Sequence, residues 1–527
     1  MVTSRVDGYL FNPFLFLGII IFFSLMIKLY RFPYDVPLGL DALEYFAYAI
    51  KMSQTGWFPT VQNFQNNGWP AFLSLFFYIM RPSGFLDYME VQRFVSIAIS
   101  VVAIIPVYLL CRRFFAVRYS LFGATLFAFD PKIALNSVLG ITEPLYILFG
   151  TLTLFLFLSR NHRYVYASFA TCGLFALIRY EGLLLIIPLS IMYFVRFRKE
   201  KRLVYRYLLS IFLFALILLP MAYIRIQTTG QDGIVSHFVA GSNYVSENVI
   251  KGMPDDDYPI VVEGQEKIII FMLRGITILV GYLGWLVIPN FIIFSGFGLY
   301  FIIKYRRYRR LDYRIVTIIL FTITLLLPAF YAYMRGIHEI RYLFIILPLF
   351  YLIATYMSKK IDDKFGKFNL LLILILLGSF FASMLFVDID KIDYEHEKEA
   401  FLISEYIVKT PKIINVDPID GNYITTAQIV KKWPTISSVA EFDVRRISTS
   451  SYNSLEEFIE KSRTNGLTHI VVDGSSSRAK YLKDVFEHEN NYPYLIKEYD
   501  SVDYGLKYHV KMYKIDYNLF DGHANNP

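Results

Sequence analysis

Cysteine is scarce in this sequence, and so are several short motifs that would mark a soluble enzyme. Only Cys111 and Cys172 occur in 527 residues, and both lie in or beside apolar segments, so no disulfide framework is predicted. The more polar C-terminal part contains no Gly-x-Gly-x-x-Gly pattern, no phosphate-binding loop and no His/Cys metal spacing. Nothing in that part therefore indicates a nucleotide site or a metal site.

Charge is also sparse, because charged residues make up 18% of the chain and hydrophobic residues 55%. Runs such as FLFLGIIIFFSLMI and LLLILILLGSFFASMLF approach the roughly 20 apolar residues that cross a bilayer. The first run lacks a small-residue cleavage pattern, so we expect it to be retained as a signal anchor. The sequence predicts a polytopic membrane protein.

About eleven membrane spans are predicted, and the basic clusters fall in alternate loops between them. The positive-inside rule makes the side that carries these clusters, and the N-terminus, cytoplasmic. The formal charge of +8 is then explained by topology, and no nucleic-acid partner is expected. Residues 66–80 are too short for a span and are interpreted as a re-entrant or interfacial segment. The predicted spans are 13–30, 92–111, 119–135, 141–158, 164–178, 182–197, 203–224, 278–303, 315–333, 341–357 and 368–387.

The predicted fold is a polytopic α-helical membrane domain followed by a small extracytoplasmic α/β domain. The membrane domain covers residues 1–387, with a large first outer loop at 31–91, and the α/β domain covers 388–527. Within the latter, helices are expected at 397–408 and 454–466, the second from a Ser-x-x-Glu box, and strands at 412–417, 468–474 and 507–517. His469 is interpreted as a packing residue at a strand end. We expect an integral protein of a prokaryotic plasma membrane, with a cytoplasmic N-terminus.

Ionisable side chains gather at the outer ends of the predicted spans. Such groups are costly near membrane depth, so those that are present become candidates for function. Arginine and histidine suit contacts to a phosphate, and a carboxylate suits a general base. The candidates are Asp41, Glu44, Asp130, Glu143, Arg179, Glu181, His338 and Arg341.

Each candidate also has a purely structural interpretation. Asp41 and Glu44 have the spacing of a helix capping box, and the pattern places them with Tyr45 and Tyr48 on the polar stripe of one helix. Asp130, before a proline, suits a turn that ends a span. The remaining acidic residues and arginines suit first-turn helix charges or interfacial ion pairs.

Four segments resemble the GT-C superfamily of integral-membrane glycosyltransferases. They are GLDALEYFAYA in the first outer loop, DPKIALNSVLGITEPLY, RYEG and HEIRYLFIILPLF. The resemblance extends over about residues 10–390. It is to the protein O-mannosyltransferase and aminoarabinose transferase group, and more distantly to oligosaccharyltransferase catalytic subunits.

The resemblance implies transfer of a sugar, with inversion, from a polyprenyl-phosphate donor such as dolichyl-phosphate mannose to a protein, lipid or glycan acceptor outside the cytoplasm. It makes Asp41 the general base, and Arg179, His338 and Arg341 the cations that neutralise the departing phosphate. Glu44 and Glu143 would orient hydroxyl groups. The resemblance specifies no cofactor and assigns no metal ligand, and the use of a divalent metal ion stays open. The other expected partners are membrane lipids.

Two other functions stay open. A lipid or solute transporter would favour an internal repeat and mid-span charges, and the sequence has neither. An oligosaccharyltransferase-like enzyme is disfavoured, because the outer domain has no WWDYG-like motif and the early loops have no DxD motif.

Overall fold

The computed structural model describes most of the chain and divides it into two compact units. The described residues are 12–59, 67–82, 85–244, 266–287, 312–365, short pieces between 373 and 385, 394–409, 452–464, 466–474 and 479–524. Those within 1–32, 58–73 and 92–391 form the first unit, and those within 33–57, 74–91 and 392–527 form the second. The predicted boundary at 387/388 stays a prediction.

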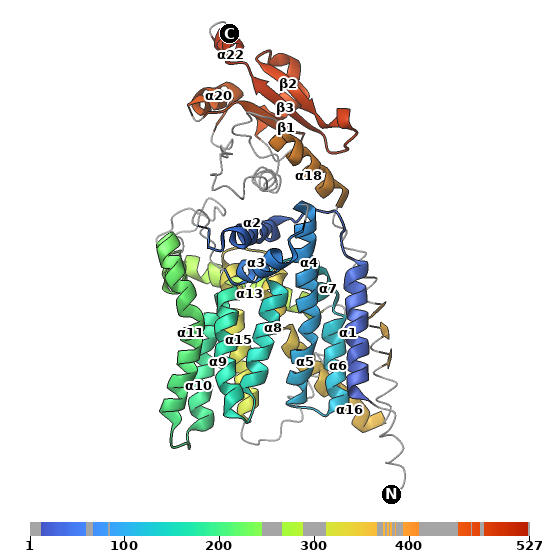
Figure 1. Ribbon diagram of the computed structural model, residues 1–527, viewed down its shortest axis with the longest axis vertical. Helices are drawn as coiled ribbons and strands as arrows, with labels where there is room; N and C mark the ends of the chain where they lie inside the picture. Colours follow the sequence, from blue (N-terminus) through green and yellow to red (C-terminus); the bar gives the residue numbers. More distant parts are fainter. Residues whose placement is uncertain are drawn as a thin grey trace. The chain divides into compact units, whose positions relative to one another are not determined.

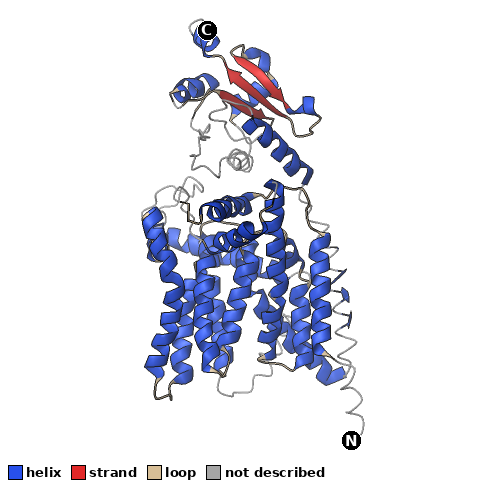
Figure 2. Ribbon diagram, viewed as in Figure 1, coloured by secondary structure: helices blue, strands red, loops and turns tan. Residues whose placement is uncertain are grey.

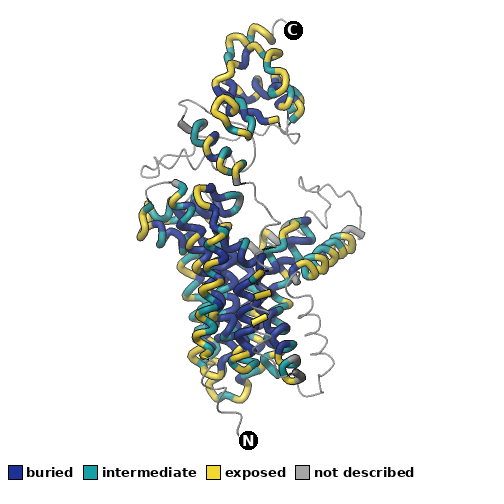
Figure 3. Tube along the Cα trace, turned by 90° about the vertical axis from the view of Figure 1, so that its right-hand side faces the viewer, coloured by how far each residue is buried: buried dark blue, intermediate teal, exposed yellow. Residues whose placement is uncertain are grey.

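The first unit is helical (Figures 1 and 2). Neighbouring helices pack in the order α1, α6, α5, α8, α9, with α10 and α11 against α9, α15 against α10, and α16 against α6. Figure 3 shows buried residues on the inner sides of these helices and exposed residues on their outer sides. The elements are α1 (Pro13–Tyr30), α5 (Ile104–Arg112), α6 (Val117–Ala128), α7 (Pro131–Ser137), α8 (Glu143–Phe157), α9 (His162–Ile178), α10 (Glu181–Phe197), α11 (Leu203–Thr229), α12 (Val235–Tyr244), α13 (Glu266–Val287), α15 (Tyr313–Met334), η2 (Ile340–Ile346) and α16 (Leu347–Phe365). Two further helices, α3 (Gly68–Met80) and α4 (Phe85–Val102), each contribute residues to both units.

Six helical segments among the described residues are long and apolar enough to cross a membrane. In two of them, Leu203–Thr229 and Ile269–Leu286, only 17% and 11% of the most apolar window is buried, so their apolar side chains are left for lipid to cover. The other four are Pro13–Tyr30, Leu86–Arg112, Tyr313–Met334 and Ile340–Lys360. An integral membrane protein is therefore confirmed, whereas the count of eleven spans and their orientation stay predictions.

The predicted span at 119–135 ends too late, because its helix breaks before residue 130. Helix α6 ends at Ala128, and α7 begins at Pro131, whose ring nitrogen has no N–H to donate. The Asp130 carboxylate accepts hydrogen bonds from the amides of Lys132 (2.9 Å) and Ile133 (3.0 Å) and so caps the new helix. Helix α13 begins at Glu266, well before the predicted 278; residues 288–303 and most of 368–387 lie outside the described residues.

The C-terminal part of the second unit contains a three-stranded antiparallel sheet with β3 in the centre (Figure 2). Strands β1 (His469–Asp473) and β3 (Val510–Ile515) confirm two predicted strands, and β2 (Leu495–Asp500) was not predicted. The predicted strand at 412–417 lies outside the described residues. The remaining elements of this unit are α2 (Leu40–Thr55), α18 (Tyr394–Lys409), α20 (Leu455–Arg463), α21 (Lys480–Glu487), η4 (Glu489–Asn491), η5 (Ser501–Tyr504) and α22 (Tyr517–Ala524).

Helices α18 and α20 confirm the two predicted helices. Ser454 caps α20 by accepting a hydrogen bond from the Glu457 amide at 3.2 Å, and the chain leaves the helix at Gly466, where φ is +83°. His469 is buried in β1, and its Nε2 lies 3.0 Å from Glu498 Oε2. It is thus a packed strand residue, as predicted.

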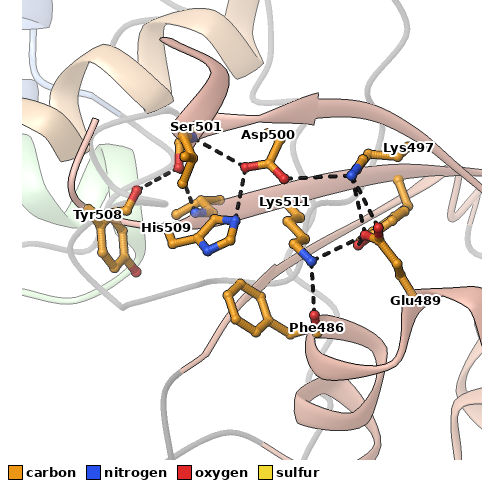
Figure 4. A network of polar contacts seen from close by, with 11 residues as sticks. Phe486, Glu489, Lys497, Asp500, Ser501, Tyr508, His509 and Lys511 are labelled. Atoms are coloured by element: carbon orange, nitrogen blue, oxygen red, sulfur yellow. Dashed lines mark hydrogen bonds and ion pairs between the residues drawn. The ribbon is translucent and has the colours of Figure 1, made fainter. Parts of the chain in front are cut away.

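A polar network ties the sheet to the turn before β2 (Figure 4). The Glu489 carboxylate accepts hydrogen bonds from the Tyr513 hydroxyl at 2.6 Å and from the Lys497 and Lys511 ammonium groups at 3.2 Å. The Tyr513 hydrogen bond, followed by those from the two lysines, lowers the pKa of Glu489 to about 2. These contacts hold η4 against β2 and β3.

Candidate active site

The start of α8 places Glu143 in the interior of the first unit. Gly140, at φ +76°, turns the chain before the helix. Its carbonyl oxygen accepts hydrogen bonds from Gln92 Nε2 at 2.7 Å and Trp69 Nε1 at 3.2 Å. Glu143 is the first residue of α8 and is completely buried. A carboxylate in such a position needs a charged partner.

The turn between α9 and α10 supplies that partner. Arg179 has extended backbone at the end of α9, and Glu181 is the first residue of α10. A Cβ at Gly182 would lie 2.5 Å from the Ala176 amide nitrogen, so only glycine allows the two helices to approach this closely. The turn brings Arg179 Nε and Nη2 to 2.9 and 2.6 Å from Glu181 Oε1.

Glu143 lies between two arginines from separate segments. Its Oε1 is 3.5 Å from Arg179 Nη1 and 4.0 Å from Arg341 Nε. The Tyr146 hydroxyl donates a hydrogen bond to the Arg341 carbonyl oxygen at 2.9 Å, and the Arg179 guanidinium lies 5.1 Å from the rings of both Tyr146 and Tyr342. Four of the predicted site residues therefore form one charge cluster around the buried Glu143; the other three are Arg179, Glu181 and Arg341.

The cluster has two features that suit a ligand. Glu181 Oε2 is buried and accepts no hydrogen bond in the described part of the chain, so a donor from a ligand would satisfy it. The Arg341 side chain keeps 24% of its surface exposed, against 11% for Arg179. Arg341 is thus the more accessible cation.

Two other predicted site residues, His338 and Asp130, have no hydrogen bond or ion pair to this cluster among the described residues. His338 is exposed, and no hydrogen bond or ion pair joins it to the cluster among the described residues. Asp130 is buried, caps α7 and interacts electrostatically with Lys28 and Lys132. The structural interpretation of Asp130 as a turn residue is therefore confirmed.

Asp41 and Glu44 lie on α2 in the second unit, and the capping-box interpretation of this pair is wrong. The helix begins at Leu40 after Gly39, and no side chain caps it, so Asp41 is already the second residue of the helix. The Glu44 side chain is exposed overall. Partial desolvation of its carboxyl group, followed by the nearby negative charge of Asp41, raises the pKa of Glu44. Tyr45 and Tyr48 are buried, which corrects the polar stripe expected for them.

Sequence reasoning missed the aromatic part of the cluster and one buried cation. Tyr146 and Tyr342 are two of 41 tyrosines, and nothing local distinguishes them. Lys28 is 1% exposed, and its Nζ donates a hydrogen bond to Ser24 Oγ at 3.0 Å. A lysine inside an apolar run is a signal that could have found it.

Comparison with known proteins identifies the fold of this arrangement. A model of the family "Dolichyl-phosphate-mannose-protein mannosyltransferase" matches residues 69–224, which include Glu143, Arg179 and Glu181. ArnT from Cupriavidus metallidurans, solved bound to undecaprenyl phosphate, is similar over 97% of this chain and 98% of its own, with a TM-score of 0.59 and 11% identity. The chain has the GT-C glycosyltransferase fold. The resemblance to GT-C membrane glycosyltransferases is thereby confirmed for the fold, and the enzymatic activity stays a prediction.

The GT-C fold also relates the chain to an archaeal enzyme. The oligosaccharyltransferase from Archaeoglobus fulgidus, solved with zinc and sulfate, is similar over 92% of this chain and 71% of its own, with a TM-score of 0.59 and 14% identity. The same enzyme has been solved with an inhibitory peptide and a dolichol-phosphate, and that structure matches with a TM-score of 0.57 and 13% identity. No curated protein sequence matches the chain significantly.

Within the described ranges, no three His, Cys, Asp or Glu side chains come together as a metal ion would require.

Proposed function

We propose that this protein transfers a sugar from a polyprenyl-phosphate-linked donor to an acceptor outside the cytoplasm. The observation that carries the proposal is the meeting of Arg179 and Arg341 at Glu143 within the GT-C fold. Two relatives of that fold bind polyprenyl phosphates, undecaprenyl phosphate in ArnT and dolichol-phosphate in the archaeal enzyme. Guanidinium groups suit such a phosphate, since they bind its oxygens with two parallel hydrogen bonds.

In the proposed reaction, Asp41 is the general base. It takes the proton of an acceptor hydroxyl as that oxygen attacks the anomeric carbon from the face opposite the phosphate. The bond between the anomeric carbon and the phosphate oxygen breaks, and the electron pair leaves with the polyprenyl phosphate. The products are an inverted glycoside and the lipid phosphate.

The charge cluster would act on the leaving group. Arg341, as the accessible arginine, neutralises the phosphate, with His338 beside it in sequence. Arg179 is held by Glu181 and Glu143, so in this proposal Glu143 is a positioning residue for both arginines. The free oxygen of Glu181 and the carboxylate of Glu44 are assigned to hydroxyl groups of the sugar or acceptor, and Asp130 to the support of α7.

A release assay tests the donor class. Purified protein incubated with a radiolabelled polyprenyl-phosphate sugar and an acceptor should move the label out of the lipid and produce free polyprenyl phosphate. The reason is that the leaving group is the lipid phosphate itself. Transfer from a soluble nucleotide sugar in the absence of lipid-linked donor would contradict the proposal.

Arg341→Lys tests the phosphate contact. Lysine keeps the charge but loses the fork of donors, so we expect the KM for the lipid-linked donor to rise by about tenfold, with folding nearly unchanged. Steady-state kinetics over a range of donor concentrations measures the change. The control is Arg335→Lys, at the end of α15 in the turn that leads to η2, whose KM should stay at the parental value. Equal kinetics for parent and Arg341→Lys would remove Arg341 from the site.

An oligosaccharyltransferase-like reaction is the second candidate, favoured by the equal TM-score of the archaeal enzyme. The chain spans nearly all of ArnT but 71% of the archaeal enzyme, which favours the ArnT-like alternative. A lipid-linked oligosaccharide offered with an acceptor peptide distinguishes them. Transfer of the whole oligosaccharide would support the second candidate over the first.

A further inference from the structure

A basic cavity lies at the opposite ends of the helices that carry the charge cluster. Arg179 and Glu181 lie at the end of α9 and the start of α10, and the cavity lies where α10 ends. It has a volume of about 710 Å3, and its lining includes Arg160, Arg196, Arg198, Lys199, Glu200 and Tyr313. Helices α9, α10 and α15 lie side by side (Figure 1). Since α10 has 17 residues, about 25 Å separates this cavity from the cluster.

Three cations of the cavity have no carboxylate partner among the described residues. Arg160, Arg198 and Lys199 are exposed, and no ion pair joins them to an acidic side chain in those ranges. The one carboxylate in the lining, Glu200, is already engaged by His162, whose Nε2 lies 2.9 Å away, and by Arg206. The cavity therefore presents uncompensated positive charge.

The fourth cation forms a wall of the cavity. The Arg196 guanidinium donates hydrogen bonds to the carbonyl oxygens of Phe157 and Ser159. It also lies 4.6 Å from the Phe197 ring centre and 4.9 Å from that of Tyr313. Arg196 is thus fixed in place, and the other three side chains remain available to an anion.

An apolar stripe leads from the cavity along the outer face of α10. Ile187, Ile191 and Val195 follow one another at intervals of four residues, so they share one helix face. They are 56%, 51% and 54% exposed, and Val195 itself lines the cavity. On a helix that packs among the membrane spans, exposed apolar side chains of this kind suit contact with lipid chains.

We propose that this cavity binds the head group of an anionic glycerophospholipid, with the acyl chains lying along Ile187, Ile191 and Val195. Basic pockets between membrane helices bind such head groups. The positive-inside rule accounts for basic residues in these loops, but it does not account for a cavity that joins unpaired cations to an apolar stripe. The apolar stripe favours a lipid over a free anion. The proposal is independent of the sugar-transfer reaction.

Two matched triple variants of the full-length protein test this site. R160Q/R198Q/K199Q removes two arginines and one lysine from the cavity. R163Q/R202Q/K201Q removes the same charges from the start of α9 and from the connection between α10 and α11, at exposed positions outside the lining. Each protein is purified in detergent, and its retention of phosphatidylglycerol and phosphatidylcholine is titrated by native mass spectrometry.

The cavity variant should bind phosphatidylglycerol on the order of a hundredfold more weakly, since each basic residue near an anionic lipid contributes about fivefold. The control variant should change by less than about threefold, and phosphatidylcholine binding should be weak in all three proteins. Equal losses in both variants would overturn the site, and so would displacement of the lipid by millimolar inorganic phosphate. If the cavity triple fails to fold, R198Q/K199Q against R202Q/K201Q makes the same comparison.

Discussion

Asp41→Asn is expected to lower the rate of sugar transfer by a factor on the order of a hundred to ten thousand, with the folded protein unchanged. Asparagine has the size of aspartate but cannot take the proton of the attacking hydroxyl, and loss of a general base has an effect of this magnitude. The measurement is the single-turnover rate with saturating lipid-linked donor. Thermal unfolding of the same preparation should match that of the parent.

Asp41 lies in the first turn of α2 and is not its N-cap residue. Its carboxylate favours the helix start through the macrodipole, so thermal unfolding of the variant separates a lost base from a weakened helix. Asp87→Asn is the matched control: Asp87 is exposed in the first turn of α4 and belongs to the same unit. Its rate should stay within about threefold of the parent, far from the effect of a lost base. If Asp41→Asn transfers sugar as fast as Asp87→Asn, the base is another residue.

Glu143→Gln is expected to have the largest effect on stability. Removing the buried carboxylate leaves Arg179 with Glu181 alone and takes from Arg341 its buried partner. Breaking a buried ion pair from one side destabilises a protein by about 3 kcal/mol. Denaturant unfolding in a detergent micelle measures this difference, and donor binding should weaken with it because both arginines lose their orientation.

The control is Glu339→Gln, which removes a carboxylate from the same arginine at the surface. Glu339 Oε2 lies 3.4 Å from Arg341 Nε, and its side chain is 48% exposed. Exposed pairs of this kind contribute at most about 1 kcal/mol. If the two substitutions lowered the free energy of unfolding by similar amounts, the burial of Glu143 would not be what makes the cluster stabilising.

The sequence predicted the helices well where an apolar run had clear ends. Helix α1 was predicted at its observed bounds, and α10 began within one residue of its predicted start. The predicted span at 119–135 continued through Asp130 and Pro131, although the same Asp-Pro pair had been interpreted as a turn that ends a span. Strand β2 was missed because Lys497 and Glu498 interrupt its apolar pattern; only the pairing with β3 makes it a strand.

The candidate site was predicted as a set of residues but not as a geometry. Costly charges at the ends of apolar runs identified Glu143, Arg179, Glu181 and Arg341. Their meeting depends on the approach of α9 and α10 at Gly182 and on the turn at Gly140, and such long-range packing has no local signature. The catalytic roles of Asp41 and the arginines stay predictions.

The central position of β3 in the C-terminal sheet has a consequence for biosynthesis. Strands β1 and β2 do not pair with each other, and each pairs with β3 along Val510–Ile515. Of these three strands the ribosome synthesises β3 last, so β1 and β2 emerge from the ribosome before their pairing partner exists. A nascent chain of this protein therefore carries two unpaired strands until β3 has been synthesised. A stop codon shortly before Val510 would leave both of these strands unpaired.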